Sequence, residues 1–272
     1  MKELAEKIGL NDSLCASVLS LCEKKENKIN NLAKKCTQHG FSALAHQNDL
    51  MKLAVCLTCA KHTKKQYKRL KISDDIFYDT MSDIRIWCEN NGNKGLKNYA
   101  WIQNHLKTEL FRLGRLQFQF YTCNNPLYDY SRLPFNKGEK TIFVHIPQGE
   151  RLIYSDCVNS LKAAKAFFAE RFPDYDYKFF ICESWLLYED NWRFMKSGCN
   201  ILQFQSLFDI VMSSTDDRQS IERIFGKRRL IKKNYPENTS LQKSTKKFML
   251  DGGKMGEGLG VINKNEIKAY CL

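Results

Sequence analysis

Two short stretches of the sequence carry the residue types that phosphate binding and acid–base chemistry need. The first, His145-Ile-Pro-Gln-Gly149, joins an apolar segment to an amphipathic segment that begins near Ser155. A strand that passes through a glycine turn into a helix offers an anion free backbone amides and a positive dipole end. A tight turn before a capped helix, with Asp156 in its first turn, explains the same residues equally well. The predicted phosphate-binding residues are Pro147, Gln148, Gly149 and Ser155.

The second stretch, Cys182-Glu-Ser-Trp-Leu-Leu187, places one carboxylate in an otherwise apolar segment. Partial burial tunes a carboxylate for proton transfer, so Glu183 is a candidate general base. The alternative is a structural ion pair with Arg112 or Arg115. His145 stands at the end of a predicted strand, and it is either a base, a substrate contact or a hydrogen-bonded core histidine.

The first 110 residues show helical periodicity, and all five prolines lie beyond residue 125. Apolar residues recur three and four positions apart, as on amphipathic helices. Asn11 or Asp12 is suited to cap the second segment, and Gly40 to end the third. Helices are predicted over residues 4–8, 13–23, 28–38, 49–70, 74–89 and 97–111.

Beyond Leu113 the apolar period changes to two, as in a half-buried strand. The segment 178–186 is almost continuously apolar, which is typical of a strand that is covered on both faces. A helical domain over residues 1–112 and an α/β sheet domain over residues 113–272 are therefore predicted. In the second domain we predict strands over 114–121, 141–146, 178–186 and 201–211, helices over 155–172, 216–225 and 240–250, and a glycine-rich tail over 252–260.

The composition limits the classes of function. The eleven cysteines mostly lie in apolar segments, and the amino terminus has no apolar signal core, so a reduced, cytoplasmic protein is expected. No apolar run is long enough to span a membrane, and no membrane partner is predicted. Cys56, Cys59 and His62 fall on one helix without a fourth ligand, and no metal site is predicted.

The formal net charge is +13. A solvated lysine-rich surface explains this charge as well as a phosphate-binding track does, and we do not predict a specific nucleic-acid role. One local cluster is suited to a polyanion such as the phosphates of a nucleotide-like ligand. It comprises Lys227, Arg228, Arg229, Lys232, Lys233, Lys243, Lys246 and Lys247.

Several motifs together carry a family resemblance. They are Phe111-Arg-Leu-Gly-Arg-Leu-Gln-Phe118, His145–Gly149, Ser160-Leu161 with Ala164 and Phe167-Phe168, Ser184-Trp-Leu-Leu187, Asn200-Ile-Leu-Gln-Phe204, and the Thr80, Asp83 and Trp87 pattern. On these motifs the chain resembles a bacterial family of acyltransferase-domain proteins. The family has a helical N-acyltransferase amino-terminal domain and a GNAT-like carboxy-terminal domain, so an α+β fold of that kind is expected.

The resemblance implies that acyl-CoA or acetyl-CoA binds where two neighbouring strands splay apart, and that the acyl group passes to an amine. Such transfer needs a base for the ammonium proton, donors for the carbonyl oxygen and an acid for the leaving thiolate. Glu183 and His145 are the candidate bases, and Tyr188 is the candidate acid. The predicted substrate cleft comprises Arg112, Arg115, Gln117, Ser184 and Asn200.

Two other functions stay open at this stage. A non-catalytic GNAT-like module that binds CoA, a nucleotide or a partner would also explain the incomplete phosphate loop, in which only Gln148 and Gly149 resemble the usual pattern. A basic nucleic-acid-associated protein is the third hypothesis. The polar face formed by Arg115, Gln117 and Gln119 is either a cleft wall or the solvent face of an edge strand.

Overall fold

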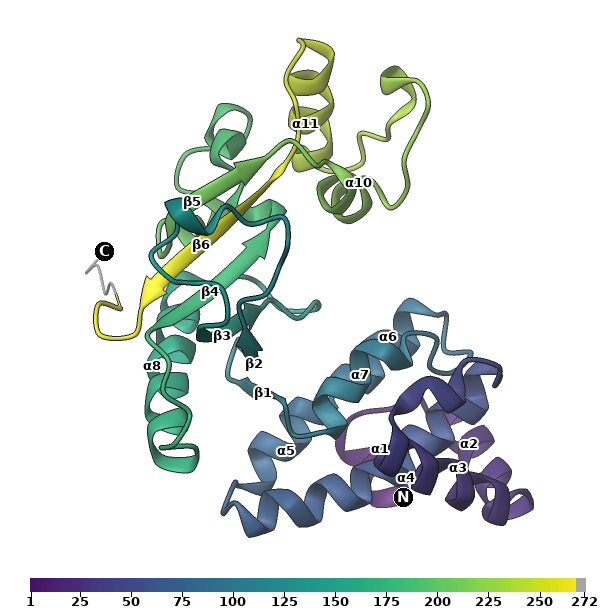
Figure 1. Cartoon of the computed structure of the whole chain (residues 1–272). Helices are drawn as coiled ribbons and strands as arrows, with labels where there is room; N and C mark the ends of the chain where they lie inside the picture. The colour runs from purple at the N-terminus through teal and green to yellow at the C-terminus, as the bar shows by residue number, and fades with distance from the viewer. Residues whose placement is uncertain (268–272) are drawn as a thin grey trace. The chain divides into compact units, whose positions relative to one another are not determined.

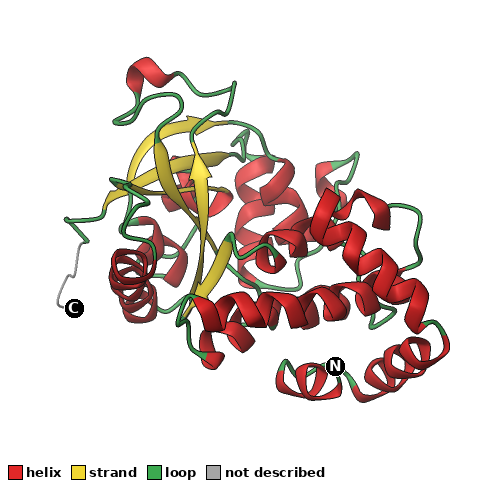
Figure 2. Cartoon of the chain, turned by 60° about the horizontal axis from the view of Figure 1, so that its bottom comes forward, coloured by secondary structure: helices red, strands yellow, loops and turns green. Residues whose placement is uncertain are grey.

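The computed structural model describes residues 1–267 and divides into two compact units. The first unit contains Met1–Gln119, His145–Glu150 and Ala166–Pro173; the second begins at Phe120 and takes the rest. Figure 2 distinguishes the helices, drawn in red, from the strands, drawn in yellow. The boundary near residue 112 stays a prediction.

Seven α-helices and a short 3-10 helix make up most of the first unit, as the helical periodicity predicts. Within residues 1–267 no helix combines the length and the apolarity needed to cross a membrane. The elements are α1 (Lys2–Lys7), α2 (Asp12–Lys24), α3 (Glu26–His39), η1 (Phe41–Leu44), α4 (Asp49–Arg69), α5 (Asp74–Met81), α6 (Asp83–Asn90) and α7 (Tyr99–Leu106).

The helix α4 is the centre of this unit. It is in contact with α2, α3, α5 and α7, and its consecutive residues from Leu53 to Ala60 are all buried. A helix that is covered all round needs apolar or small residues on every face, which this segment provides. The predicted end signals are confirmed, since the side chain of Asn11 accepts from the amides of Ser13 and Leu14 and Gly40 ends α3 with φ at 87°.

Two predicted helices are wrong in their extent. Residues 74–89 form two helices that meet at Ser82. The Ser82 amide is shared between the carbonyls of Tyr78 and Asp79, and its hydroxyl donates to the Asp79 carbonyl oxygen at 2.6 Å. A serine hydroxyl that bonds back to the preceding turn in this way bends a helix. The helix predicted over 97–111 ends at Leu106. Thr108 then takes a left-handed φ of 61°, and a strand follows.

Within residues 1–267, six strands form one mixed sheet in the order β1-β2-β3-β4-β6-β5. β1 and β2 are antiparallel, β3 and β4 are parallel, and β6 is antiparallel to both β4 and β5. In Figure 1, β4, β6 and β5 run side by side, with α10 and α11 beyond one end of them. The strands are β1 (Leu110–Leu113), β2 (Leu116–Thr122), β3 (Lys140–His145), β4 (Phe179–Ser184), β5 (Asp209–Ser214) and β6 (Glu257–Asn263).

The helices of the second half carry a clear apolar stripe. In α8 (Tyr154–Arg171), Cys157, Leu161, Ala164 and Phe168 are buried, spaced three and four apart as predicted. A separate apolar cluster joins α10 and α11 around Phe225, Tyr235 and Phe248. The remaining elements are η2 (Tyr130–Arg132), η3 (Trp185–Leu187), η4 (Glu189–Arg193), α9 (Asn200–Gln205), α10 (Arg218–Phe225), η5 (Lys232–Asn234) and α11 (Ser240–Leu250).

Two predictions for the carboxy-terminal sheet are wrong. The segment 201–211 was expected to be a strand, but its first half forms α9, in which Phe204 is buried against Phe208 at 5.2 Å between ring centroids. The strand begins only at Asp209. Residues 257–260 of the glycine-rich tail belong to β6, a strand that lies between β4 and β5. Its glycines Gly258 and Gly260 leave room for backbone and side chains that a Cβ atom would meet.

Gly258 offers the sharpest test of that close approach. A Cβ atom at this position would lie 2.2 Å from the carbonyl oxygen of Leu187, which is backbone and cannot rotate away. Gly258→Ala is expected to lower the free energy of unfolding by about 1–3 kcal/mol or more, measured by urea unfolding. Ser213→Ala is the matched control. Ser213 lies on β5 directly opposite Gly258, and its buried hydroxyl has no hydrogen-bond partner within the described residues. Equal stabilities for the two variants would contradict the close approach.

Candidate functional site

His145 lies at the end of β3 and belongs to a polar cluster within the first unit. Its Nε2 is 2.8 Å from Gln119 Oε1 on β2. An amide oxygen only accepts, so the ring donates from Nε2 and Nδ1 carries the lone pair. The indole of Trp101 on α7 meets the imidazole edge to face, with ring centroids 4.8 Å apart and planes at 78°.

A buried carboxylate holds that indole. Asp83 is 3% exposed at the first position of α6, and its Oδ2 accepts from Trp101 Nε1 at 2.6 Å. The same oxygen is 3.1 Å from Nε2 of His105, whose side chain is fully buried. Gln117 Nε2 lies 3.5 Å from that nitrogen. Three side chains, two from α7 and one from β2, thus surround the carboxylate of Asp83 on α6.

The surroundings lower the pKa of both Asp83 and His145, for different reasons. Burial raises the pKa of Asp83, but hydrogen bonds from His105, Trp101 and Gln117, together with the charge of His105, outweigh it and hold that pKa below its ordinary value. Burial, aided by His105 and opposed by Asp83, lowers the pKa of His145 to about 3. The imidazole of His145 is therefore uncharged at neutral pH, and only its neutral form carries a lone pair.

The turn after β3 is held by two buried arginines. Arg115 donates to the carbonyls of Pro147 and Glu150, at 3.0 and 2.8 Å. Arg112 forms an ion pair with the Glu150 side chain at 2.8 Å. Arg115 and Gln117 are 6% and 1% exposed, so they do not form the solvent face of an edge strand. The two arginines fix the backbone of residues 147–150.

Glu183 lies in the second unit, on β4. Its Oε2 accepts from the hydroxyl of Tyr128 at 2.8 Å, and burial, followed by the charge of Glu183, raises the pKa of that hydroxyl. Glu183 is in register with Leu259, which is in register with Met212 on β5, and directly paired residues share a face of a sheet. The carboxylate therefore shares its face with an apolar row that leads to the sheet edge.

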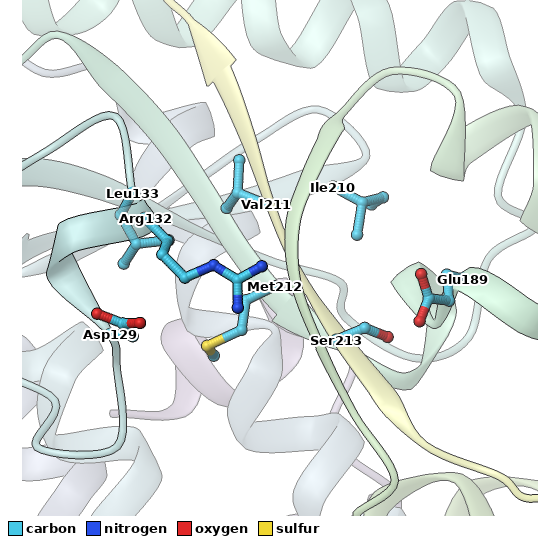
Figure 3. Close-up of a pocket in the computed structure, with 8 residues that line it drawn as sticks. All are labelled: Asp129, Arg132, Leu133, Glu189, Ile210, Val211, Met212 and Ser213. Carbon is cyan, nitrogen blue, oxygen red and sulfur yellow. The ribbon is translucent and has the colours of Figure 1, made fainter.

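A cavity of about 320 Å³ lies beside that edge strand. Figure 3 shows one guanidinium, from Arg132, and two carboxylates, from Asp129 and Glu189, among the side chains that line it. The lining residues are Asp129, Arg132, Leu133, Glu189, Ile210, Val211, Met212 and Ser213.

The parallel strands β3 and β4 pair over a short stretch only. Their register joins Ile142 to Phe180 and Phe143 to Ile181, and in the described chain it does not continue to Val144 and Cys182. β4 is meanwhile paired with β6 along its whole length, from Phe179 to Ser184. Within residues 1–267, the carboxyl end of β4 is therefore in register with β6, while its register with β3 ends at Ile181.

Comparison with protein families decides the identity of the chain. Residues 110–262 match the GNAT-like C-terminal domain. The chain belongs to this family. Residues 1–108 match the N-acyltransferase N-terminal domain, so the family resemblance that the motifs indicated is confirmed for both halves.

Solved structures of an acyltransferase are similar to the chain over most of its length. They include complexes with decanoyl-CoA and teicoplanin, with decanoyl-CoA, and, for a mutant, with octanoyl-CoA. Each is 17% identical, with 96% of this chain and 86% of the other covered and a TM-score of 0.76. At this identity the likeness shows the fold, an acyltransferase fold, and the predicted fold class is confirmed. Comparison with curated proteins gave no match.

The other predicted site residues of the GNAT-like domain occupy varied positions. Ser184 Oγ accepts from the Leu186 amide and donates to Gln219, at 3.2 and 3.3 Å. Tyr188 is 4% exposed, and burial raises its pKa. Asn200 is the exposed first residue of α9, and Ser155 is exposed in the first turn of α8. Their functional roles stay predictions.

Much of the predicted phosphate turn and basic cluster is engaged within the protein. Gln148 Oε1 accepts from Asn90 at 2.7 Å, and Gly149 takes a φ of 106° with open space around it. Arg228 forms an ion pair with Asp217, and Lys246 with Glu237. These contacts favour a structural role for part of both sets.

Sequence reasoning missed His105 and Trp101. The family motifs include Asp83, and the polar strand face includes Gln117 and Gln119, but neither pattern points to these two residues of α7. The signal in the sequence was the spacing of Trp101 and His105, four apart on one face of α7. That their side chains meet the carboxylate of a different helix depends on tertiary packing.

The depressed pKa of His145 makes a test of its surroundings possible. As the pH falls from about 6.5 towards about 3, the unfolded chain takes up a proton that the folded protein does not. The free energy of unfolding therefore falls as the pH falls through this range. His145 contributes at most about 1.4 kcal/mol per pH unit to that fall. His145→Asn is expected to remove that part of the slope in urea unfolding at a series of pH values. His46→Asn, at an exposed position, should retain it, and identical slopes for both variants would contradict the assignment.

Proposed function

We propose that this protein transfers an acyl group from coenzyme A to an amine. The observation that carries the proposal is the early end of pairing between β3 and β4 within a GNAT-like domain. Folds of this kind hold acyl-CoA where two neighbouring strands separate. The complexes of the similar acyltransferase with octanoyl-CoA and decanoyl-CoA support a medium-length acyl chain as the donor, while acetyl-CoA stays an alternative.

In the proposed reaction the amine nitrogen attacks the thioester carbonyl, a base accepts the proton of the amine, and the CoA thiolate leaves. His145 is proposed as the base, because it stands at the end of β3 and its hydrogen bond from Nε2 to Gln119 puts the lone pair on Nδ1. Glu183, whose carboxylate is oriented by Tyr128, is the second candidate base. Tyr188 is proposed as the acid that returns a proton to the thiolate, since burial raises its pKa and keeps the phenol protonated.

The acceptor is proposed to be an amine of a small molecule or peptide. The similar acyltransferase forms a complex with teicoplanin, which supports an acceptor larger than a simple amine. Pro147, Gln148, Gly149 and Ser155 stay proposed contacts of the CoA phosphates, with the open space at Gly149 as support. A cytoplasmic protein without a membrane partner is part of the same proposal.

Thermal unfolding in the presence of ligands tests the binding half of the proposal. Decanoyl-CoA, acetyl-CoA and free CoA should each raise the melting temperature in a saturable way. A ligand at about one hundred times its dissociation constant stabilises the folded state by about 2.7 kcal/mol. If no CoA species raises the melting temperature, the proposed use of acyl-CoA loses its main support. Stabilisation that disappears with added salt and is matched by unrelated oligonucleotides would favour nucleic-acid binding.

Turnover on a panel of amines tests the chemical half. The variant that removes the base, His145→Gln or Glu183→Gln, should lower kcat by about a hundredfold or more while acyl-CoA still stabilises the protein. Glu222→Gln, at an exposed position on α10, should behave as the parent protein. CoA binding without turnover on any amine would instead favour a non-catalytic binding module.

A further inference from the structure

The structure assigns a positioning role to Asp83 and Trp101 for the histidine at the end of β3. We infer that the buried Asp83 carboxylate anchors the Trp101 indole, and that the indole and Gln119 together hold the His145 ring in one orientation and one tautomer. This inference rests on the proposed function for its catalytic meaning, since it treats His145 as the base.

Asp83 anchors the indole of Trp101 through a short hydrogen bond that is shielded from water. Trp101 Nε1 donates to Asp83 Oδ2 at 2.6 Å, and Asp83 is 3% exposed. An indole has a single polar hydrogen, so this one bond fixes how the ring lies. A hydrogen bond to a buried charged acceptor is stronger than one between neutral groups and is costly to break.

The anchored indole in turn restricts the imidazole. Its centroid is 4.8 Å from that of His145, with the planes at 78°, an edge-to-face arrangement that aromatic pairs favour. Gln119 Oε1 lies 2.8 Å from His145 Nε2. The first contact fixes the plane of the ring and so keeps Nε2 directed at Gln119. The hydrogen bond to Gln119, which needs that orientation, then fixes which nitrogen carries the proton. The lone pair is then on Nδ1.

His105 completes the surroundings of the anchor. It lies 3.1 Å from the Asp83 oxygen that accepts from Trp101, and its ring is 5.4 Å from the indole in a second edge-to-face pair. Asp83 and His105 are the ionisable groups that act on His145. His105 lowers the pKa of His145 and Asp83 raises it, so their charges oppose each other. The main effect of the cluster on His145 is therefore to hold the orientation of its ring.

The Trp101→Phe variant tests the inference, because phenylalanine keeps an aromatic ring and removes the hydrogen that Asp83 holds. The tautomer is measured from the nitrogen chemical shifts of the His145 imidazole at neutral pH. The parent protein should show one tautomer with the proton on Nε2, and Trp101→Phe should show an averaged signal. Its kcat should fall by about tenfold to a hundredfold, with the KM for acyl-CoA and the thermal shift by acyl-CoA changed less than about threefold.

Two further variants keep the test decisive. Gln119→Leu removes the second restraint from a different element and should release the tautomer even where Trp101→Phe folds poorly. Trp192→Phe is the matched control, since Trp192 is 68% exposed in η4, and it should retain the tautomer and kcat of the parent.

The outcomes separate the two proposals. A parent-like tautomer and kcat in Trp101→Phe would overturn the positioning role. A parent protein that binds no acyl-CoA and acylates no amine would overturn the proposed function, while the nitrogen shifts would still decide how the ring is held.

Discussion

The hydrogen-bonded pairing of β4 with β6 is the constraint on which the sheet depends. Every residue of β4 from Phe179 to Ser184 has a partner on β6, so β4 is fixed in position from one side. Its pairing with β3 on the other side can therefore end after Ile181 without loss of the strand.

That pairing also explains the unusual composition of β6. Glycine is normally unfavourable within a strand, because it packs no side chain and loses much conformational freedom on folding. Here Gly258 faces the Leu187 backbone, and Gly260 faces Phe208 and the side chain of Leu187. The close approach of η3 to β6 thus requires glycine, and it brings the segment that leads to Tyr188 against the centre of the sheet.

A second constraint operates in the first unit, where Asp83 is ionised although it is almost fully buried. An isolated carboxylate would not remain charged there, because removal from water favours the protonated form. Hydrogen bonds from Trp101, His105 and Gln117 reverse that preference. The carboxylate consequently fixes side chains from α7 and β2, and through Trp101 it acts on the end of β3.

The sequence by itself determined the family, the helical first half, the buried strand β4 and the stripe of α8. Motifs and periodicity are local, and the amphipathic pattern of a long helix survives in any packing. Tertiary structure decided the rest. Local pattern predicted a strand over α9 and a tail over β6, because alternation and glycine content do not reveal what packs against a segment. Likewise, the spacing of Trp101 and His105 indicates that they share one face of a helix, but only the fold brings Asp83 to that face. A buried carboxylate needs hydrogen-bond donors, and here they come from other elements of the chain.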